Sequence, residues 1–284
     1  MLPAMKAALM AQQAETPLFL LLCMFLIIFL TLIFFIQRAR GGFPFSKAWD
    51  YKIRRLSALA ALDEVVGRAT ELGRPVHFTL GAGRFTPDTF AGFAMLGYLA
   101  RKCAEYDCPL VITNMQVTVH MATMEIVRAA YQEAGYPDRL RPDTVRFISK
   151  DEFPFVAGAL SVIRERKAAA SVLLGTCGSA SLILVEGAHS AGAFQIAGTD
   201  DSDQLPFYFV ACEQVLLGEE IYGAGAALGN DPIVRGSFRG QDMLRIFVII
   251  TIIGLALLVT LNEITGSAWG WLDQFVGWLR GSSS

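Results

Sequence analysis

The stretch Val76–Pro87 reads VHFTLGAGRFTP, and it decides the fold. Its first residues, Val76 to Leu80, form a short apolar run of the kind found in buried strands. A glycine turn follows, and then Pro87, which suits the first turn of a helix. A strand that passes through a glycine turn into a helix is typical of parallel α/β sheets, because the helix returns the chain for another parallel strand. This stretch therefore predicts a βα unit.

The same alternation continues along the middle of the chain. Four further apolar runs predict strands at Leu110–Thr113, Val145–Ile148, Ser171–Leu174 and Phe207–Cys212. Amphipathic stretches predict helices at Ser57–Glu71, Pro87–Tyr106, Val119–Gly135, Phe155–Lys167, Ser179–His189 and Glu219–Leu228. Several strand runs are apolar throughout, as expected where helices cover both faces of a sheet. We expect an α/β domain with a Rossmann-like, doubly wound parallel sheet of about five strands.

The composition points to membrane segments. The chain has 284 residues, of which 54% are hydrophobic and only 18% are charged, with a mean hydropathy of +0.45. Leu18–Ile36 contains no charged residue and would span roughly 28 Å as a helix. Ile246–Leu261 is a second such run, of about 24 Å. The competing interpretations are a secretory signal peptide for the first and a buried core helix for the second. We expect two transmembrane helices that tether the α/β domain.

Basic residues beside these runs predict the orientation. Six basic residues follow the first run, namely Arg38, Arg40, Lys47, Lys52, Arg54 and Arg55. Three arginines precede the second run, namely Arg235, Arg239 and Arg245. Lys and Arg accumulate on the cytoplasmic side of membrane proteins. We therefore expect an inner-membrane protein that crosses the bilayer twice, with a cytoplasmic central domain and both termini outside.

These features divide the chain into six segments. They are an N-terminal anchor at 1–37, a basic linker at 38–55, the α/β domain at 56–230, a second linker at 231–244, the second transmembrane helix at 245–262 and an amphipathic tail at 263–284. The tail contains three tryptophans, and its apolar residues recur at helical spacing, at Ala268, Trp271, Leu272, Phe275 and Leu279. Such a helix lies flat on a lipid bilayer or binds a partner protein.

The charge pattern constrains the partners. A formal net charge of −2 excludes a nucleic-acid binder that works through overall positive charge. Residues 56–167 contain 13 basic and 13 acidic side chains, whereas residues 168–230 contain seven acidic and no Lys or Arg residues. The second part thus favours a cation or a basic partner. The alternative is an acidic rim that is solvated or balanced by the basic linker.

The first strand-to-helix turn is a candidate ligand site. Gly81 and Gly83 would let the backbone approach a phosphate, and Arg84 could hold an anion. Thr86 replaces the third glycine of a dinucleotide-binding motif, however, and Asn114 stands where an acidic residue would bind ribose. A standard dinucleotide motif is therefore absent, and a tight turn without a ligand is the alternative.

The turn after the fourth strand is the second candidate. It reads Gly175-Thr176-Cys177-Gly178-Ser179 and opens a predicted helix, whose N-terminus would lower the pKa of the thiol. A catalytic thiolate needs a base, and His189 lies about three helical turns away. Both turns fall at the C-terminal edge of a parallel sheet, so they should lie together if their strands are neighbours.

A metal site is the weaker hypothesis. Glu186 and His189 are three residues apart and share one face of a helix. Glu213 or the acidic run at 200–203 would have to supply the remaining ligands. The alternative is a hydrogen-bonded polar pair between helix and strand.

Three long segments resemble a known family. They are HFTLGAGRF at 77–85, PLVITNMQVTVHMATMEIVRAAYQEAGYPD at 109–138, and the stretch 172–226 that begins VLLGTCGSASL and ends EEIYGAGA. Together with the two apolar runs they resemble an uncharacterised bacterial family of membrane proteins, a domain of unknown function, over roughly residues 18 to 262. The resemblance implies no activity, cofactor or catalytic residue.

We therefore expect an accessory or scaffold component of a bacterial membrane assembly, in contact with the lipid bilayer and with a second copy or another component of the complex. Its α/β domain would bind a partner or a small ligand. The alternative is a membrane-tethered nucleotide-dependent or hydrolytic enzyme, with its site at the C-terminal ends of the strands.

Overall fold

The computed structural model describes residues 57–82, 85–229 and 232–264, together with Leu26, Phe29, Leu30, Ile33 and Phe34. The chain divides into two units. One consists of residues 50–234, and the other combines residues 1–49 with residues 235–284. The first of these units contains all the strands of the described part of the chain.

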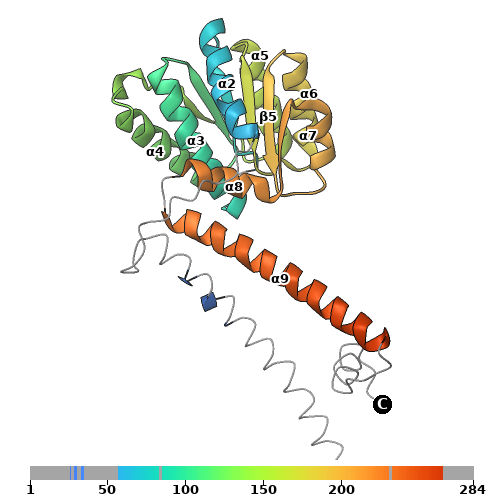
Figure 1. The fold of residues 1–284 in the computed structure, drawn as a ribbon. Coiled ribbons are helices and arrows are strands. Elements are labelled where there is room, and N and C mark those ends of the chain that lie inside the picture. The colour runs from blue at the N-terminus through green and yellow to red at the C-terminus, as the bar shows by residue number, and fades with distance from the viewer. Residues whose placement is uncertain are drawn as a thin grey trace, which may run out of the picture. The chain divides into compact units, whose positions relative to one another are not determined.

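Strands and helices alternate through this α/β unit (Figure 1). The strands are β1 (Val76–Thr79), β2 (Leu110–Asn114), β3 (Val145–Phe147), β4 (Ala170–Leu174), β5 (Phe194–Thr199) and β6 (Gln214–Leu217). The α-helices are α2 (Ser57–Leu72), α3 (Pro87–Glu105), α4 (Val117–Glu133), α5 (Glu152–Glu165), α6 (Ser181–Ser190), α7 (Leu205–Ala211) and α8 (Glu219–Leu228). Two 3₁₀ turns, η1 (Pro137–Arg139) and η2 (Gly178–Ala180), complete the unit in its described part.

All six strands are parallel, in the order β3-β2-β1-β4-β5-β6. This is the strand order of Rossmann-type sheets. Strands β1 to β3 are added toward one side of the sheet and β4 to β6 toward the other, so the strand order reverses between β1 and β4. Thr79 lies opposite both Thr113 of β2 and Leu173 of β4. The carboxyl ends of β1, β2 and β4 are therefore level, and the turns that follow them leave the same edge of the sheet.

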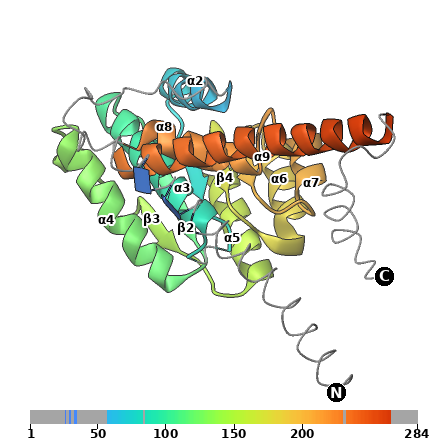
Figure 2. The ribbon, with the colours of Figure 1, turned by 60° about the horizontal axis from the view of Figure 1, so that its bottom comes forward.

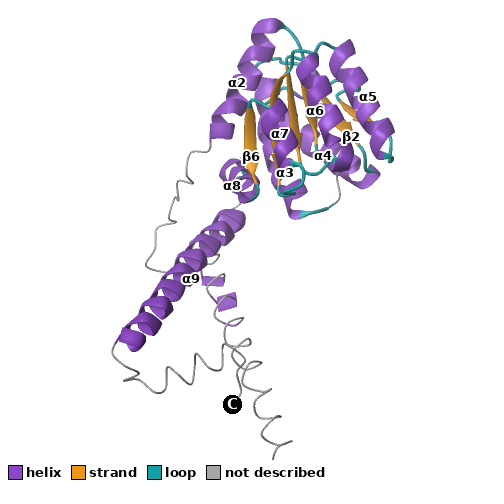
Figure 3. Ribbon diagram, turned by 90° about the vertical axis from the view of Figure 1, so that its right-hand side faces the viewer, coloured by secondary structure: helices purple, strands orange, loops and turns teal. Residues whose placement is uncertain are grey.

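Helices cover both faces of the sheet, as Figures 2 and 3 show. Val76 and Phe78 of β1, with Leu80 directly after the strand, belong to a core cluster on one face that includes residues of α2, α3, α4 and α8. Leu173 and Ala197 point to the other face and pack with α5, α6 and α7. The sheet is thus doubly wound and Rossmann-like, as the sequence predicted.

A buried polar network joins the three central strands. His77 of β1 places Nδ1 at 2.9 Å from the Ser171 hydroxyl of β4, and Nε2 at 2.9 Å from the Thr113 hydroxyl of β2. Burial lowers the pKa of His77 to about 3, because the charged imidazolium would lose its hydration. His77 is therefore a neutral structural residue that links neighbouring strands.

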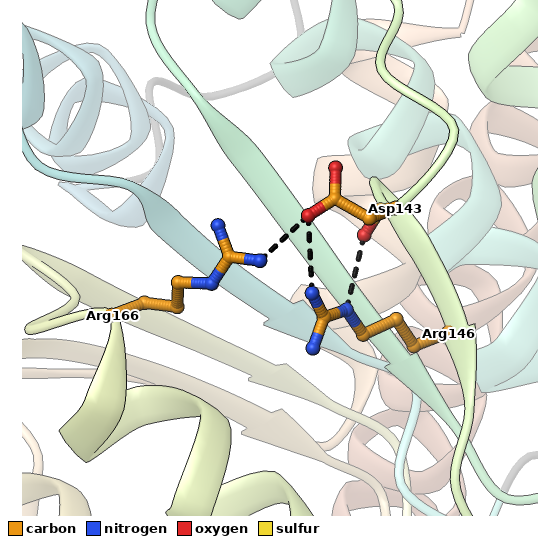
Figure 4. Close-up of polar contacts among 3 residues, drawn as sticks. All are labelled: Asp143, Arg146 and Arg166. Carbon is orange, nitrogen blue, oxygen red and sulfur yellow. Dashed lines mark hydrogen bonds and ion pairs between the residues drawn. The ribbon is translucent and has the colours of Figure 1, made fainter.

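An ion-pair cluster lies near the amino ends of β3 and β4, at the opposite edge of the sheet. Asp143 precedes β3 and accepts hydrogen bonds from Arg166, at the end of α5, at 2.6 Å and from Arg146 at 3.1 Å (Figure 4). Arg146 also donates through Nε to the Asp143 backbone carbonyl, at 3.2 Å. The hydrogen bond from Arg166 is the main cause that lowers the pKa of Asp143. The cluster ties α5 to the start of β3.

The number of strands differs from the prediction of five. Phe207–Cys212 was predicted as a strand, but it falls mostly within the helix α7, which has Pro206 in its first turn. Tyr208 and Ala211 are buried three residues apart, whereas Phe209 and Val210 between them are exposed, which is a helical pattern. The strands β5 and β6 were not predicted. Gly198 and the polar Gln195 weaken the apolar strand pattern of β5, and β6 comes directly after the segment that was predicted as the last strand.

The membrane part of the predicted fold is wrong for the described residues. Among the helices in 57–82, 85–229 and 232–264, none is both long enough and apolar enough to cross a membrane. The helix α9 (Pro232–Ile264) contains the second predicted span, Ile246–Leu261, and does not meet this requirement. The second transmembrane helix of the predicted fold is therefore not supported, and the first predicted span lies outside the described residues except for five of them.

Several predicted segments fall outside the described residues. They are the linker at 38–55, the tail beyond Ile264 and, except for five residues, the first predicted span Leu18–Ile36. The helix α9 begins at Pro232, within the segment 231–244 that was predicted to be a linker.

Candidate functional site

The two glycine turns that the sequence singled out are in direct contact. The Ala82 N–H, after β1, donates a hydrogen bond of 2.5 Å to the Thr176 carbonyl, after β4. Gly81 has φ +61°, and a Cβ there would overlap the Thr176 carbonyl oxygen and lie 2.7 Å from Cys177 Sγ. The close approach of the turns therefore requires glycine at position 81. The two turns meet because β1 and β4 are neighbouring strands.

Two backbone N–H groups at the second turn are hydrogen-bonded to side chains of the same chain. The Cys177 N–H donates to Gln204 Oε1 at 2.9 Å, and the Ala180 N–H donates to Glu152 Oε1 at 2.8 Å. The Ser179 hydroxyl contacts the same Glu152 oxygen at 3.3 Å. A carboxylate from the first turn of α5 thus occupies the position in which a helix N-terminus receives an anionic ligand.

Gly178 fits closely against this carboxylate. It has φ +60°, and its Cβ would lie 2.5 Å from Glu152 Oε1. Gly175, with φ +93°, packs in the same manner against the Leu80 carbonyl, which lies 3.0 Å from the position of its Cβ. Both glycines therefore serve contacts within the protein.

Cys177 lies buried between the two turns. Burial raises the pKa of its thiol to about 12, the nearby Glu152 carboxylate adds to the rise, and a hydrogen bond from the Ala82 N–H opposes it. We expected the helix start to lower this pKa, but η2 comes first and the loss of hydration dominates. His189 is exposed near the other end of α6. The thiol therefore stays protonated at neutral pH, and His189 is not positioned to act as its base.

Two buried side chains at this edge have polar atoms without a hydrogen-bond partner in the described part of the chain. Asp88, in the first turn of α3, is 2% exposed, and its Oδ1 has no hydrogen-bond partner among the described residues. Asn114, the last residue of β2, is 1% exposed, and neither Oδ1 nor Nδ2 has a partner there. Leaving such a group unsatisfied costs about 1–3 kcal/mol. These atoms of Asp88 and Asn114 could form hydrogen bonds with a ligand at the C-terminal edge of the sheet.

The remaining predicted site residues are less informative. Gly83 and Arg84 lie outside the described residues. Glu186 and His189 are exposed on α6, and the Glu213 carboxylate accepts a hydrogen bond of 2.6 Å from the Gln195 N–H. No group of three His, Cys, Asp or Glu side chains in the described ranges could hold a metal ion. The structure does not bring Glu186, His189 and Glu213 together as a metal site.

Residues 10–269 match the model of the family described as Domain of unknown function (DUF6754). The chain belongs to this family. The match covers most of the chain, including the whole α/β unit. No curated protein and no solved structure matches the chain. For this DUF6754 member, function has to be argued from the site itself.

Sequence reasoning missed three residues of the site. Glu152, Gln204 and Asp88 are far apart in the sequence, and tertiary structure brings them to the ends of β1 and β4. Glu152 and Asp88 had a usable signal, because each is an acidic residue in the first turn of a helix that follows a strand. Gln204 had none, because it precedes a helix that was predicted as a strand.

Proposed function

We propose that the α/β unit is a non-catalytic binding domain of a protein assembly, with the C-terminal edge of its sheet as the contact surface. One observation carries the proposal. Three N–H groups at the edge where a Rossmann-type sheet receives phosphate, those of Ala82, Cys177 and Ala180, are here hydrogen-bonded to Thr176, Gln204 and Glu152 of the same chain. A nucleotide would have to displace these contacts and enter beside a carboxylate that repels it.

Exposed apolar side chains around the same edge support a protein partner. Phe85 and Phe90, at the start of α3, are 53% and 58% exposed, and their ring centroids lie 5.8 Å apart. Val117 and Met121 are exposed in the first turns of α4, and Phe153 is exposed in the first turn of α5. All five residues lie just beyond the carboxyl end of a strand. Exposed apolar surface of this kind marks sites of protein interaction.

A nucleotide-dependent or hydrolytic enzyme is the second candidate. The strand order favours it, because ligands of such sheets bind where the order reverses, here between β1 and β4. The direct hydrogen bond between the two turns closes that crevice at Ala82 and Thr176. The enzyme would therefore require the turns to separate when its substrate binds.

Two measurements on the full chain test the proposal. The first is thermal unfolding in the presence of nucleotides, inorganic phosphate and divalent cations. A ligand at 100 times its Kd stabilises by about 2.7 kcal/mol, which is a clear rise in melting temperature. We expect no rise. A rise that the Gly81→Ala variant loses would contradict the proposal and favour the enzyme.

The second measurement is self-association by analytical ultracentrifugation. We expect Phe90→Ser to weaken association, because this residue lies at the proposed contact surface. Leu72→Ser is the matched control, since Leu72 is 56% exposed at the end of α2, away from this edge. If both variants self-associate as strongly as the wild type, a second copy of the chain is not the partner of this surface.

A further inference from the structure

The packing of α8 on α3 places Tyr222 beside Asp88. A Cβ on Gly225 would lie 2.8 Å from Ala91 Cα, and one on Gly229 would lie 3.9 Å from Ala94 Cβ. The second contact comes just after the end of α8, so the C-terminal part of α8 lies against the first half of α3. Tyr222 and Asp88 each lie one turn before the Gly225–Ala91 contact in their own helices, and the Asp88 carboxylate is close enough to raise the pKa of the Tyr222 hydroxyl.

Tyr222 connects this position to the end of β5. Its hydroxyl donates a hydrogen bond of 2.6 Å to Asp200 Oδ2, and Asp200 directly follows β5. Asp88 Oδ2 lies 3.3 Å from the Cβ position of Gly175, which directly follows β4. Burial raises the pKa of the Tyr222 hydroxyl, and the carboxylates of Asp200 and Asp88 raise it further. Two carboxylates therefore flank one phenol at the ends of β4 and β5.

The negative charge of this acidic site, defined by Asp88, Asp200 and Tyr222, is not balanced by the described residues. The ion pairs recorded in the described part of the chain involve neither Asp88 nor Asp200. Residues 168–230 contain no Lys or Arg. A buried carboxylate without a partner is costly, and a positive charge beside it removes that cost. An anionic ligand would be repelled from the same position.

We propose that the acidic site binds a guanidinium or ammonium group from a basic side chain of the protein partner. This inference rests on the proposed function and names the chemistry by which the partner is recognised. A guanidinium group has several N–H donors in one plane and can contact two carboxylates at once. A single organic cation fits better than a metal ion, because no three ligating side chains are gathered among the described residues.

Binding of L-argininamide to the full chain tests this site directly. L-citrullinamide is the matched control ligand, since it has the same size and a neutral ureido group in place of guanidinium. At constant ionic strength, isothermal titration calorimetry should show saturable binding of argininamide that is at least ten times tighter than that of citrullinamide. Equal binding of the two compounds overturns the proposal. Tighter binding of putrescine than of argininamide overturns the assignment to a protein side chain.

Charge-neutralising variants locate the binding. Asp88→Asn should abolish argininamide binding, and Asp200→Asn should weaken it at least fivefold. Asp203→Asn is the control, because Asp203 is an exposed acid of the same loop, and it should bind as the wild type does. Without ligand, Asp88→Asn should melt at a higher temperature than the wild type, since it removes a buried charge. Unchanged argininamide binding in Asp88→Asn overturns the proposal even if Asp200→Asn fails to fold.

The chain's own Arg84 is the remaining competitor. If argininamide binds to Arg84→Gln but not to the wild type, the guanidinium of Arg84 fills the acidic site and the assignment to a partner is wrong. These outcomes are separate from those of the proposed function. Loss of self-association in Phe90→Ser, together with no argininamide binding in any variant, would leave the contact surface in place and remove only the cation site.

Discussion

The contact between the two glycine turns predicts a large effect of Gly81→Ala. Gly81 has φ +61°, and a Cβ there would overlap the Thr176 carbonyl oxygen and press on Cys177 Sγ. Adding a Cβ at positive φ costs about 1 kcal/mol. Moving the Thr176 carbonyl away breaks its hydrogen bond with the Ala82 N–H and leaves polar groups unsatisfied, which costs about 1–3 kcal/mol more. We expect a total loss of about 2–4 kcal/mol of unfolding free energy.

Gly73→Ala provides the matched control. Gly73 also has φ +61°, but no heavy atom lies within 4 Å of the position of its Cβ. Only the backbone strain applies there, so we expect a loss of about 1 kcal/mol. Urea denaturation of the wild type and both variants, followed by far-UV circular dichroism, measures the difference. Equal losses in the two variants would refute the inference that close packing of the turns determines the requirement for glycine at position 81.

Two further predictions concern pH. The pKa of His77 is lowered to about 3 in the folded state, whereas its ordinary value is near 6.5. Between these two values the unfolded state binds one more proton than the folded state does. The free energy of unfolding is therefore highest above pH 6.5 and falls as the pH decreases toward 3. The unfolding free energy from urea denaturation should change with pH by about 1 kcal/mol per pH unit between pH 6 and 4, and by less in His77→Gln. The same pH dependence in both proteins would contradict the burial of a neutral imidazole. The Asp143 carboxylate has a lowered pKa, so its stabilisation is present above the ordinary pKa of 3.8 and disappears as the pH falls through the lower folded value. Asp143→Asn should therefore lower the melting temperature slightly at pH 7 but not at pH 2. At pH 7 the decrease should be smaller in 0.5 M NaCl than at low salt, and an equal decrease at both salt concentrations would argue against an electrostatic cause.

The order of most elements could be predicted because it depends on local pattern. The glycine turn after Val76–Leu80, the apolar run of Ser171–Leu174 and the helix signal at Pro87 are local, and each was confirmed by the structure. The segment Phe207–Cys212 failed because aromatic and β-branched residues suit a buried strand as well as the buried face of a short helix. The packing of Tyr208 and Ala211 against α5, α6 and β5 decided between the two.

The apolar runs at the ends of the chain show the limit of composition. Two uncharged apolar runs, judged by their composition and length, predicted two membrane spans. Among the described residues, which include α9, no helix is both long enough and apolar enough to cross a membrane. The first run, Leu18–Ile36, stays a prediction for the residues that the structure does not describe.

The sequence by itself determined that the turns Gly81–Ala82 and Gly175–Gly178 follow strands and precede helices, because strand and turn signals act over a few residues. Only the tertiary structure decided what these turns contact. Strand order brought β1 next to β4, so the turns bind each other, and the crossing of α5 brought Glu152 to the start of α6. The packing of α8 on α3 likewise set Tyr222 beside Asp88. Such contacts join residues that are from 28 to 134 positions apart, and no local signal encodes them, because they depend on how whole elements pack.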